Sequence, residues 1–136
     1  VASGECAIAV ANSYYLARLM RSDKPADQAV VAALRVVMPN QATTGTHMNV
    51  AGGAVAANAP HKAGAVRFLE YLASDAAQAH FANGNNEWPA VPGVAMTNTA
   101  LNAMTANGFN TDTTPIADIG AKQVAVQQML DRVGFR

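Results

Sequence analysis

The feature that most constrains the fold is a short apolar run that leads directly into a helix. Residues 6–11 read CAIAVA, which is typical of a strand buried in a parallel sheet. Asn12 and Ser13 follow, and both are favoured N-cap residues, so a helix is expected to begin here. Its apolar face is formed by Leu16, Leu19 and Met20. A strand that passes directly into a helix predicts an α/β layered architecture.

Further strands and helices are expected along the chain. The strands are predicted at 35–40 and 47–60, and the pair Gly52-Gly53 inside the second indicates a bulge or a close backbone approach. The helices are predicted at about 25–35, 61–73, 74–82, 97–106 and 118–133. Their apolar faces outnumber the strands available to cover them, so the chain is expected to be part of something longer.

Single residues predict where several helices begin and end. Pro25 is expected in the first turn of its helix, and Ser74 is expected to cap the helix that follows it. Gly84 is predicted to be the glycine that terminates that second helix. The chain opens with Val-Ala-Ser-Gly-Glu, without an initiator Met or a leader, which also suggests a processed or truncated beginning.

Charge and motif content exclude several classes of function. Nine acidic and nine basic residues give the 136-residue chain a net charge of zero, so no basic field favours nucleic acid. No catalytic triad, phosphate-binding loop or zinc motif is found, so a binding protein is expected rather than an enzyme. The one cysteine, Cys6, is predicted to be a small buried residue of the first strand, the alternative being a partner outside the chain.

Two adjacent tyrosines, Tyr14 and Tyr15, stand in the first turn of the first predicted helix. They are consistent with packing residues that hydrogen-bond at their tips, or with residues that hold a ligand. A helix N-terminus attracts anions, and Asn12 is first an N-cap and second an anion contact. The spacing alone therefore leaves packing, a plain anion site and a metal site open.

Other polar and aromatic residues are assigned structural roles. The histidines are expected to be solvated or capping residues: His47, His61 and His80. Trp88 is expected to anchor its loop, where Glu87 beside it could also line a cleft. Arg18 and Arg21 are expected to form a solvated helix face.

Three motifs occur together and in order: Asn-x-Tyr-Tyr at 12–15, Gly-Thr-His-x-Asn at 45–49 and Glu-Trp-Pro at 87–89. With their surroundings they resemble the C-terminal part of periplasmic ferric-iron-binding proteins, the substrate-binding components of iron(III) ABC importers. The likeness runs over nearly the whole chain. It implies part of a type II periplasmic-binding-protein fold, an α/β fold with two lobes. The lobes would be incomplete here, and chain exchange or association could complete them.

The resemblance assigns stretches of the chain to the two lobes. Residues 1–45 would belong to the C-terminal lobe, 46–95 would cross to the N-terminal lobe, and 96–136 would return to the C-terminal lobe. The implied partners are an ABC permease in the parent protein and either the missing N-terminal portion or further copies of the chain. The implied location is the periplasm.

The resemblance also assigns the tyrosines. Tyr14 and Tyr15 match the adjacent pair that binds Fe(III), and Asn12 matches the asparagine that helps hold a synergistic anion, carbonate or phosphate. The chemistry agrees, because Fe(III) is a hard cation that prefers oxygen ligands and favours phenolate over phenol. Two alternatives remain, a self-assembling fragment with little or no iron binding and a solute-binding protein for a small anion.

Overall fold

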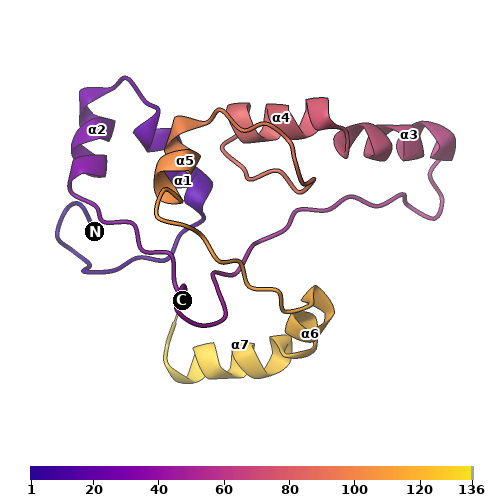
Figure 1. Ribbon diagram of the computed structural model, residues 1–136. Helices are drawn as coiled ribbons and strands as arrows, with labels where there is room; N and C mark the ends of the chain where they lie inside the picture. The colour runs from indigo at the N-terminus through magenta and orange to yellow at the C-terminus, as the bar shows by residue number, and fades with distance from the viewer. Residues whose placement is uncertain (136) are drawn as a thin grey trace. The chain divides into compact units, whose positions relative to one another are not determined.

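The computed structural model describes residues 1–135, and within them it contains helices and no β-strand (Figure 1). The helices are α1 (Ser13–Met20), α2 (Pro25–Ala32), α3 (Lys62–Leu72), α4 (Asp75–Gly84), α5 (Thr99–Met104), α6 (Ile116–Ala121) and α7 (Gln123–Arg132). They fall into two compact units, Val1–Val37 with Asn49–Gly108, and Met38–Met48 with Phe109–Arg136. Among the described residues, no helix is both long enough and apolar enough to cross a membrane.

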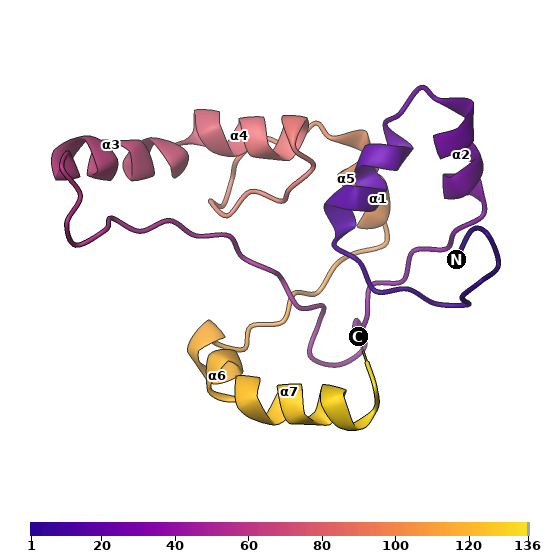
Figure 2. The same ribbon diagram turned by 180° about the vertical axis from the view of Figure 1, so that it is seen from behind.

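The core of the first unit lies where α1 meets α5, which both views of the ribbon place side by side (Figures 1 and 2). Ala17 of α1 and Leu101 of α5 have no exposed surface, and Ala100 is 3% exposed. The partly buried side chains packed around them are Met20, Trp88, Met96 and Met104. This cluster is small, but it fixes α1 by burying the middle of the helix between its two ends.

A buried asparagine network joins α5 to the end of α4. Asn98 caps α5, because its Oδ1 accepts from the backbone N–H groups of Ala100 at 3.1 Å and Leu101 at 3.2 Å. Its Nδ2 donates to the carbonyl of Ala82 and to Oδ1 of Asn86, both at 2.9 Å. Every polar atom of the Asn98 amide therefore has a partner, which satisfies the requirement for burial.

The roles predicted for Pro25 and Ser74 at helix starts are confirmed, but the one predicted for Gly84 is not. Pro25 is the first residue of α2, and the Ser74 hydroxyl accepts from the backbone N–H of Ala77 at 3.3 Å to cap α4. Gly84 was predicted to terminate that helix, but it is the last helical residue and has no positive φ. Asn86 takes the left-handed conformation instead, with φ 63°, because asparagine tolerates this region and its side chain is held by the network.

The strands predicted at 6–11, 35–40 and 47–60 are not formed. No backbone hydrogen bond joins residues 5–11 or 49–55 to any other described residue. A strand exists only when a neighbouring strand accepts and donates its backbone hydrogen bonds, and the described residues supply none for these segments. The prediction for Cys6 is wrong for the same reason, because without a sheet its side chain is exposed.

The close backbone approach predicted at Gly52-Gly53 is confirmed for the second glycine. A Cβ built on Gly53 would lie 2.7 Å from Cδ2 of Leu69 in α3, whereas one on Gly52 would meet nothing within 4 Å. The extended segment thus passes against α3 at Gly53. Leu69 is half-buried, while its neighbour Phe68 is 59% exposed.

In the second unit, the side-chain amide of Gln41 makes two hydrogen bonds with the backbone of Asn110, and these hold the turn-rich segment 41–46. Gln41 donates from Nε2 to the carbonyl of Asn110, and its Oε1 accepts from the N–H of Asn110, both at 2.8 Å. Thr46 and Thr111 form an isolated parallel β-bridge next to these two hydrogen bonds. Gly45 lies against this bridge with φ 88°, and a Cβ there would be 2.6 Å from the carbonyl carbon of Thr111, so only glycine fits without strain.

The helix predicted at 118–133 is divided into α6 and α7 by a single turn residue, Lys122. Its N–H donates to the carbonyl of Ile119, three residues back, at 3.0 Å, so the helix tightens at this point. Gly120 lies just before the break and is a poor helix former, which weakens this turn. Gly134 follows α7 in the left-handed conformation with φ 66°, which is common for a glycine just after a helix.

Candidate functional site

The two adjacent tyrosines lie at the surface of the first unit, in the first turn of α1. Ala17, which is fully buried, follows them by less than one turn and fixes this end of the helix against the core. Tyr15 is 49% exposed and Tyr14 is half-buried. Neither ring belongs to the buried core, so packing alone does not account for the pair.

The rings and the neighbouring asparagine form one contact group. The ring centroids of Tyr14 and Tyr15 are 4.3 Å apart, and the ring planes are tilted by 43°. Asn12 Nδ2 donates to the Tyr14 hydroxyl oxygen at 3.3 Å. Asn12 occupies the N-cap position of α1, as predicted, but its side chain accepts no backbone N–H of the helix. The side-chain cap expected from its residue type is therefore not formed, and the amide serves the tyrosine instead.

The hydrogen bonds make the two phenols unequal acids. The hydrogen bond with Tyr15, followed by the one from Asn12, lowers the pKa of Tyr14 below its ordinary value. The same hydrogen bond, in which the Tyr15 hydroxyl donates to the Tyr14 oxygen, raises the pKa of Tyr15. Tyr14 is therefore the more acidic of the two phenols.

The loop after α4 brings a carboxylate toward the tyrosines. The negative charge of Glu87 raises the pKa of Tyr14, in opposition to the hydrogen bonds. Glu87 is held by its N–H, which donates to the carbonyl of Phe81 at 3.3 Å, and Trp88 next to it packs on the core cluster. The prediction that Trp88 anchors its loop is confirmed. The sequence did not predict that Glu87 acts on the pKa of Tyr14, although the Glu-Trp-Pro motif at 87–89 had already drawn attention to this loop.

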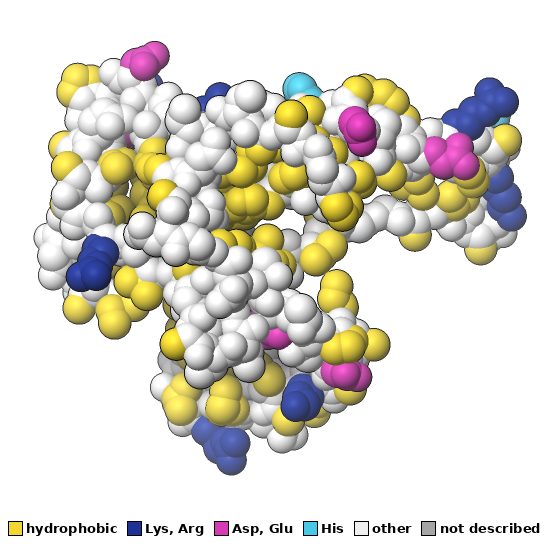
Figure 3. Space-filling model, in the orientation of Figure 1, with side chains coloured by type: hydrophobic (Ala, Val, Ile, Leu, Met, Phe, Trp, Pro, Cys, Tyr) yellow, Lys and Arg dark blue, Asp and Glu magenta, His cyan; other side chains and the backbone are white. Residues whose placement is uncertain are grey.

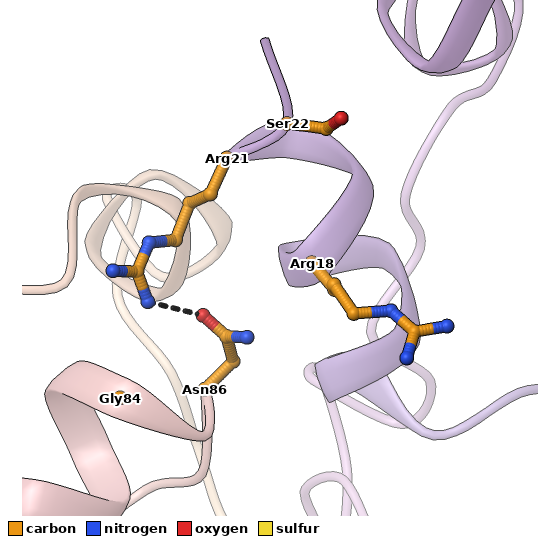
Figure 4. Close-up of a pocket in the computed structure, with 5 residues that line it drawn as sticks. All are labelled: Arg18, Arg21, Ser22, Gly84 and Asn86. Atoms are coloured by element: carbon orange, nitrogen blue, oxygen red, sulfur yellow. Dashed lines mark hydrogen bonds between the residues drawn. The ribbon is translucent and has the colours of Figure 1, made fainter. Parts of the chain in front are cut away.

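An open cavity of about 330 Å³ lies beside the other end of α1. Its lining residues are Arg18, Arg21, Ser22, Gly84 and Asn86 (Figure 4). Arg21 Nη1 donates to the carbonyl of Asn83 and to Oδ1 of Asn86, both at 2.7 Å. Arg18 and Arg21 are both exposed, as predicted for a solvated helix face. Arg18 points away from Arg21 (Figure 4). The two guanidinium groups therefore do not converge on one ligand position. Neither tyrosine lines this cavity. The tyrosine pair is a better candidate site than the cavity.

Metal chemistry based on other residue types has no support in the described part of the chain. Residues 1–135 contain no group of three or more His, Cys, Asp or Glu side chains that could hold a metal ion. Tyr14 and Tyr15 offer paired oxygen donors, and oxygen donors of this kind suit a hard cation.

Comparison with known proteins places the chain among bacterial solute-binding proteins. Residues 1–111 match the family of bacterial extracellular solute-binding proteins. Iron uptake protein A2 from Synechocystis is 41% identical over 139 residues, which is 100% of this chain and 39% of that protein. The resemblance seen in the sequence is thus confirmed.

Solved structures agree with the sequence matches. A Trichodesmium protein in complex with iron and citrate ligands is 47% identical with a TM-score of 0.87, covering 100% of this chain and 42% of that one. The ferric binding protein from Campylobacter jejuni is 30% identical with a TM-score of 0.87 over the same shares. The chain therefore has the backbone path of part of a periplasmic solute-binding protein, and it spans about two fifths of the length of these relatives.

Proposed function

We propose that this chain, which belongs to the bacterial extracellular solute-binding protein family, binds ferric iron for uptake through Tyr14 and Tyr15. The observation that carries the proposal is the exposed pair of phenols, 4.3 Å apart by ring centroids, with Asn12 donating to one of them. The relatives named for iron uptake and ferric binding support the same substrate. The role is binding and delivery, not catalysis.

The acidity of the pair suits this substrate. Fe(III) favours phenolate, and Tyr14 already loses its proton more readily than an ordinary tyrosine because of its hydrogen bonds. The metal has to displace the protons of both phenols, and the proton of Tyr14 is the more readily lost. Two phenolates offset two of the three positive charges of Fe(III), and an anion is needed for the remainder.

The N-terminal end of α1 offers a place for that anion. The Asn12 side chain does not cap the helix, and of the first-turn N–H groups that of Tyr15 donates to the Asn12 carbonyl at 3.2 Å, so other N–H groups of this turn have no side-chain acceptor from Asn12. Open N–H groups and the positive end of the helix dipole favour an anion. We assign carbonate or phosphate to this position, with Asn12 as a further donor; citrate is the anion found with iron in the Trichodesmium protein.

Two phenolates and an anion do not fill the coordination sphere of Fe(III) with protein donors. An octahedral ion keeps water at the remaining positions unless further oxygen ligands arrive. The proposed parent protein supplies them from its other lobe, which closes on the metal about a hinge. In that setting residues 1–45 and 96–136 belong to the C-terminal lobe and 46–95 cross to the N-terminal lobe. The iron passes to an ABC permease from the periplasm.

Visible absorption spectroscopy tests the tyrosine site. Fe(III) citrate titrated into the chain with bicarbonate present is expected to give a visible tyrosinate-to-iron charge-transfer band. The double variant Tyr14→Phe/Tyr15→Phe should lose the band. Tyr71→Phe removes the only other tyrosine, which is 58% exposed on α3, and should keep it. A band that persists in the double variant would exclude this site.

The anion is tested in the same assay. Repeating the titration with bicarbonate, phosphate or citrate as the only added anion ranks their ability to support the band. Asn12→Ala should weaken the band most with the preferred anion, because it removes the side-chain donor. An equal loss with all three would assign Asn12 to positioning Tyr14 alone.

A further inference from the structure

The chain contains two Asn-Gly pairs, Asn83-Gly84 and Asn107-Gly108, and they lie in different local structures. In such a pair the backbone nitrogen of the glycine can reach the side-chain amide carbon of the asparagine, because glycine has no Cβ to obstruct the approach. Whether the two atoms meet depends on the backbone angles and the hydrogen bonds around each pair.

The first pair is held in place by the fold. Asn83 and Gly84 are the last two residues of α4. The half-buried Asn83 side chain accepts at Oδ1 from the backbone N–H and from the hydroxyl of Thr97, at 2.8 and 3.1 Å. A five-membered ring between the Gly84 nitrogen and Asn83 Cγ forms only after both hydrogen bonds break and the backbone leaves its helical angles. Asn83 is therefore protected from ring closure.

The second pair is open to solvent. Asn107 and Gly108 are both exposed, in the turn that follows α5. Among residues 1–135, no hydrogen bond holds the Asn107 side-chain amide. Gly108 has a φ of 91°, and a Cβ built on it would meet nothing within 4 Å, so the space beside it is free. The hydrogen bond from the Gly108 N–H to the Thr105 carbonyl, at 3.1 Å, has to open, and it closes a single turn.

We propose that Asn107 is a site of spontaneous deamidation, and that the fold protects Asn83 from the same reaction. The Gly108 backbone nitrogen loses its proton to water or hydroxide and attacks Asn107 Cγ. The N–Cγ bond forms, the Cγ–Nδ2 bond breaks, and ammonia leaves after taking up a proton from solvent. Water then opens the resulting succinimide at one of its two carbonyl carbons, which leaves an aspartyl or an isoaspartyl residue. No atom is oxidised or reduced in these steps.

The reaction changes both the charge and the backbone of the chain. Acidic and basic side chains are both scattered over the visible face (Figure 3), and they balance at nine each, so the new carboxylate lowers the net charge by one unit from zero. The isoaspartyl product carries the backbone through Cβ and lengthens it by one methylene group. Gly108 ends the first unit and Phe109 begins the second, so the change lies next to the connection between the two units.

The experiment compares the two pairs within one chain. The 136-residue chain is incubated at mildly alkaline pH without metal, so the result is independent of the proposed iron site. A glutamate-specific protease cleaves after Glu87 and places the two pairs in different peptides. Mass spectrometry of the peptides measures the two deamidation rates. Asn107 is expected to react roughly tenfold or more faster than Asn83, because two hydrogen bonds of Asn83 have to break first.

Unfolding and substitution provide the controls. In urea the protection of Asn83 is lost, and the two rates should become nearly equal. Isoelectric focusing of the folded chain should show an acidic form that Asn107→Gln removes, because glutamine would have to form a larger ring. Asn85→Gln is the matched control, since Asn85 is also exposed but is followed by Asn86 rather than glycine, and it should leave the acidic form unchanged.

Three outcomes would overturn the proposal. One is equal rates for the two pairs in the folded chain, and another is a faster reaction at Asn83. The third is an acidic form that persists in Asn107→Gln. A fast reaction at Asn107 and a slow one at Asn83, with the difference abolished by urea, supports it.

Discussion

Two regions of the first unit, the α1–α5 block (helices α1 and α5 with the core around Ala17 and Leu101) and α3, differ in how far their side chains are buried. In the block, Ala17 and Leu101 have no exposed surface, and a buried asparagine network joins the helix ends. In α3, Phe68 and Tyr71 are 59% and 58% exposed, and no side chain of the helix is fully buried, although Leu69 lies close to Gly53. An amphipathic pattern thus predicts a helix, but it does not show that the chain itself contains what covers the helix.

The difference has a consequence for the tyrosine site. Tyr14 and Tyr15 stand on the helix that the block holds, so their spacing is set by contacts within this chain. The described residues of α3 include no fully buried side chain. We therefore expect contacts within this chain to position the paired phenols, and the comparison of the two regions can be tested directly.

The largest effect is expected from truncating the centre of the block. Leu101→Ala removes a fully buried side chain and should lower the free energy of unfolding by about 3 kcal/mol. Phe68→Ala on α3 removes a larger side chain, yet one that is 59% exposed, and should cost less than about 1 kcal/mol. Urea unfolding followed by helical circular dichroism measures both. Equal costs would mean that α3 is packed as tightly as the block.

A smaller effect is expected where Leu69 of α3 meets Gly53. Gly53→Ala places a methyl group against Leu69 Cδ2, whose flexible side chain can move away, so the cost should stay below about 1 kcal/mol. Gly52→Ala is the control, with nothing within 4 Å of the added atom. The clearer readout is the NMR signal of the Leu69 methyl groups, which should shift for Gly53→Ala and stay unchanged for Gly52→Ala. A shift in both variants would argue against a specific contact.

The smallest effect concerns the acidity of the site rather than stability. The charge of Glu87 raises the pKa of Tyr14, so Glu87→Gln should lower that pKa further. Tyrosine absorbance titrated with alkali measures the change, and Tyr71→Phe provides a background with only the pair remaining. Glu70→Gln on α3 is the charge-matched control and should leave the titration unchanged. A rise in the pKa of Tyr14 in Glu87→Gln would contradict the assigned direction.

Much of the local structure could be predicted, and much of the packing could not. Asn12, Pro25 and Ser74 mark helix starts correctly, because the preferences of these residues act over one helical turn. Gly84 was misassigned since either a glycine or an asparagine can take the left-handed conformation, and tertiary hydrogen bonds selected Asn86. The predicted strands failed because an apolar run identifies a segment suited to a sheet, whereas a strand needs a partner outside that segment.

The candidate site likewise combines features that the sequence predicts with features that only the tertiary structure shows. The adjacency of Tyr14 and Tyr15 and their place at a helix start were fixed by the order of residues along the chain. Only the tertiary structure decided that the rings lie at the surface, that the Asn12 amide serves Tyr14 rather than the helix, and that Glu87 acts on the same phenol. The physical reason is that helix propensity and capping are short-range, while burial, hydrogen-bond choice and pKa depend on groups brought together from distant positions.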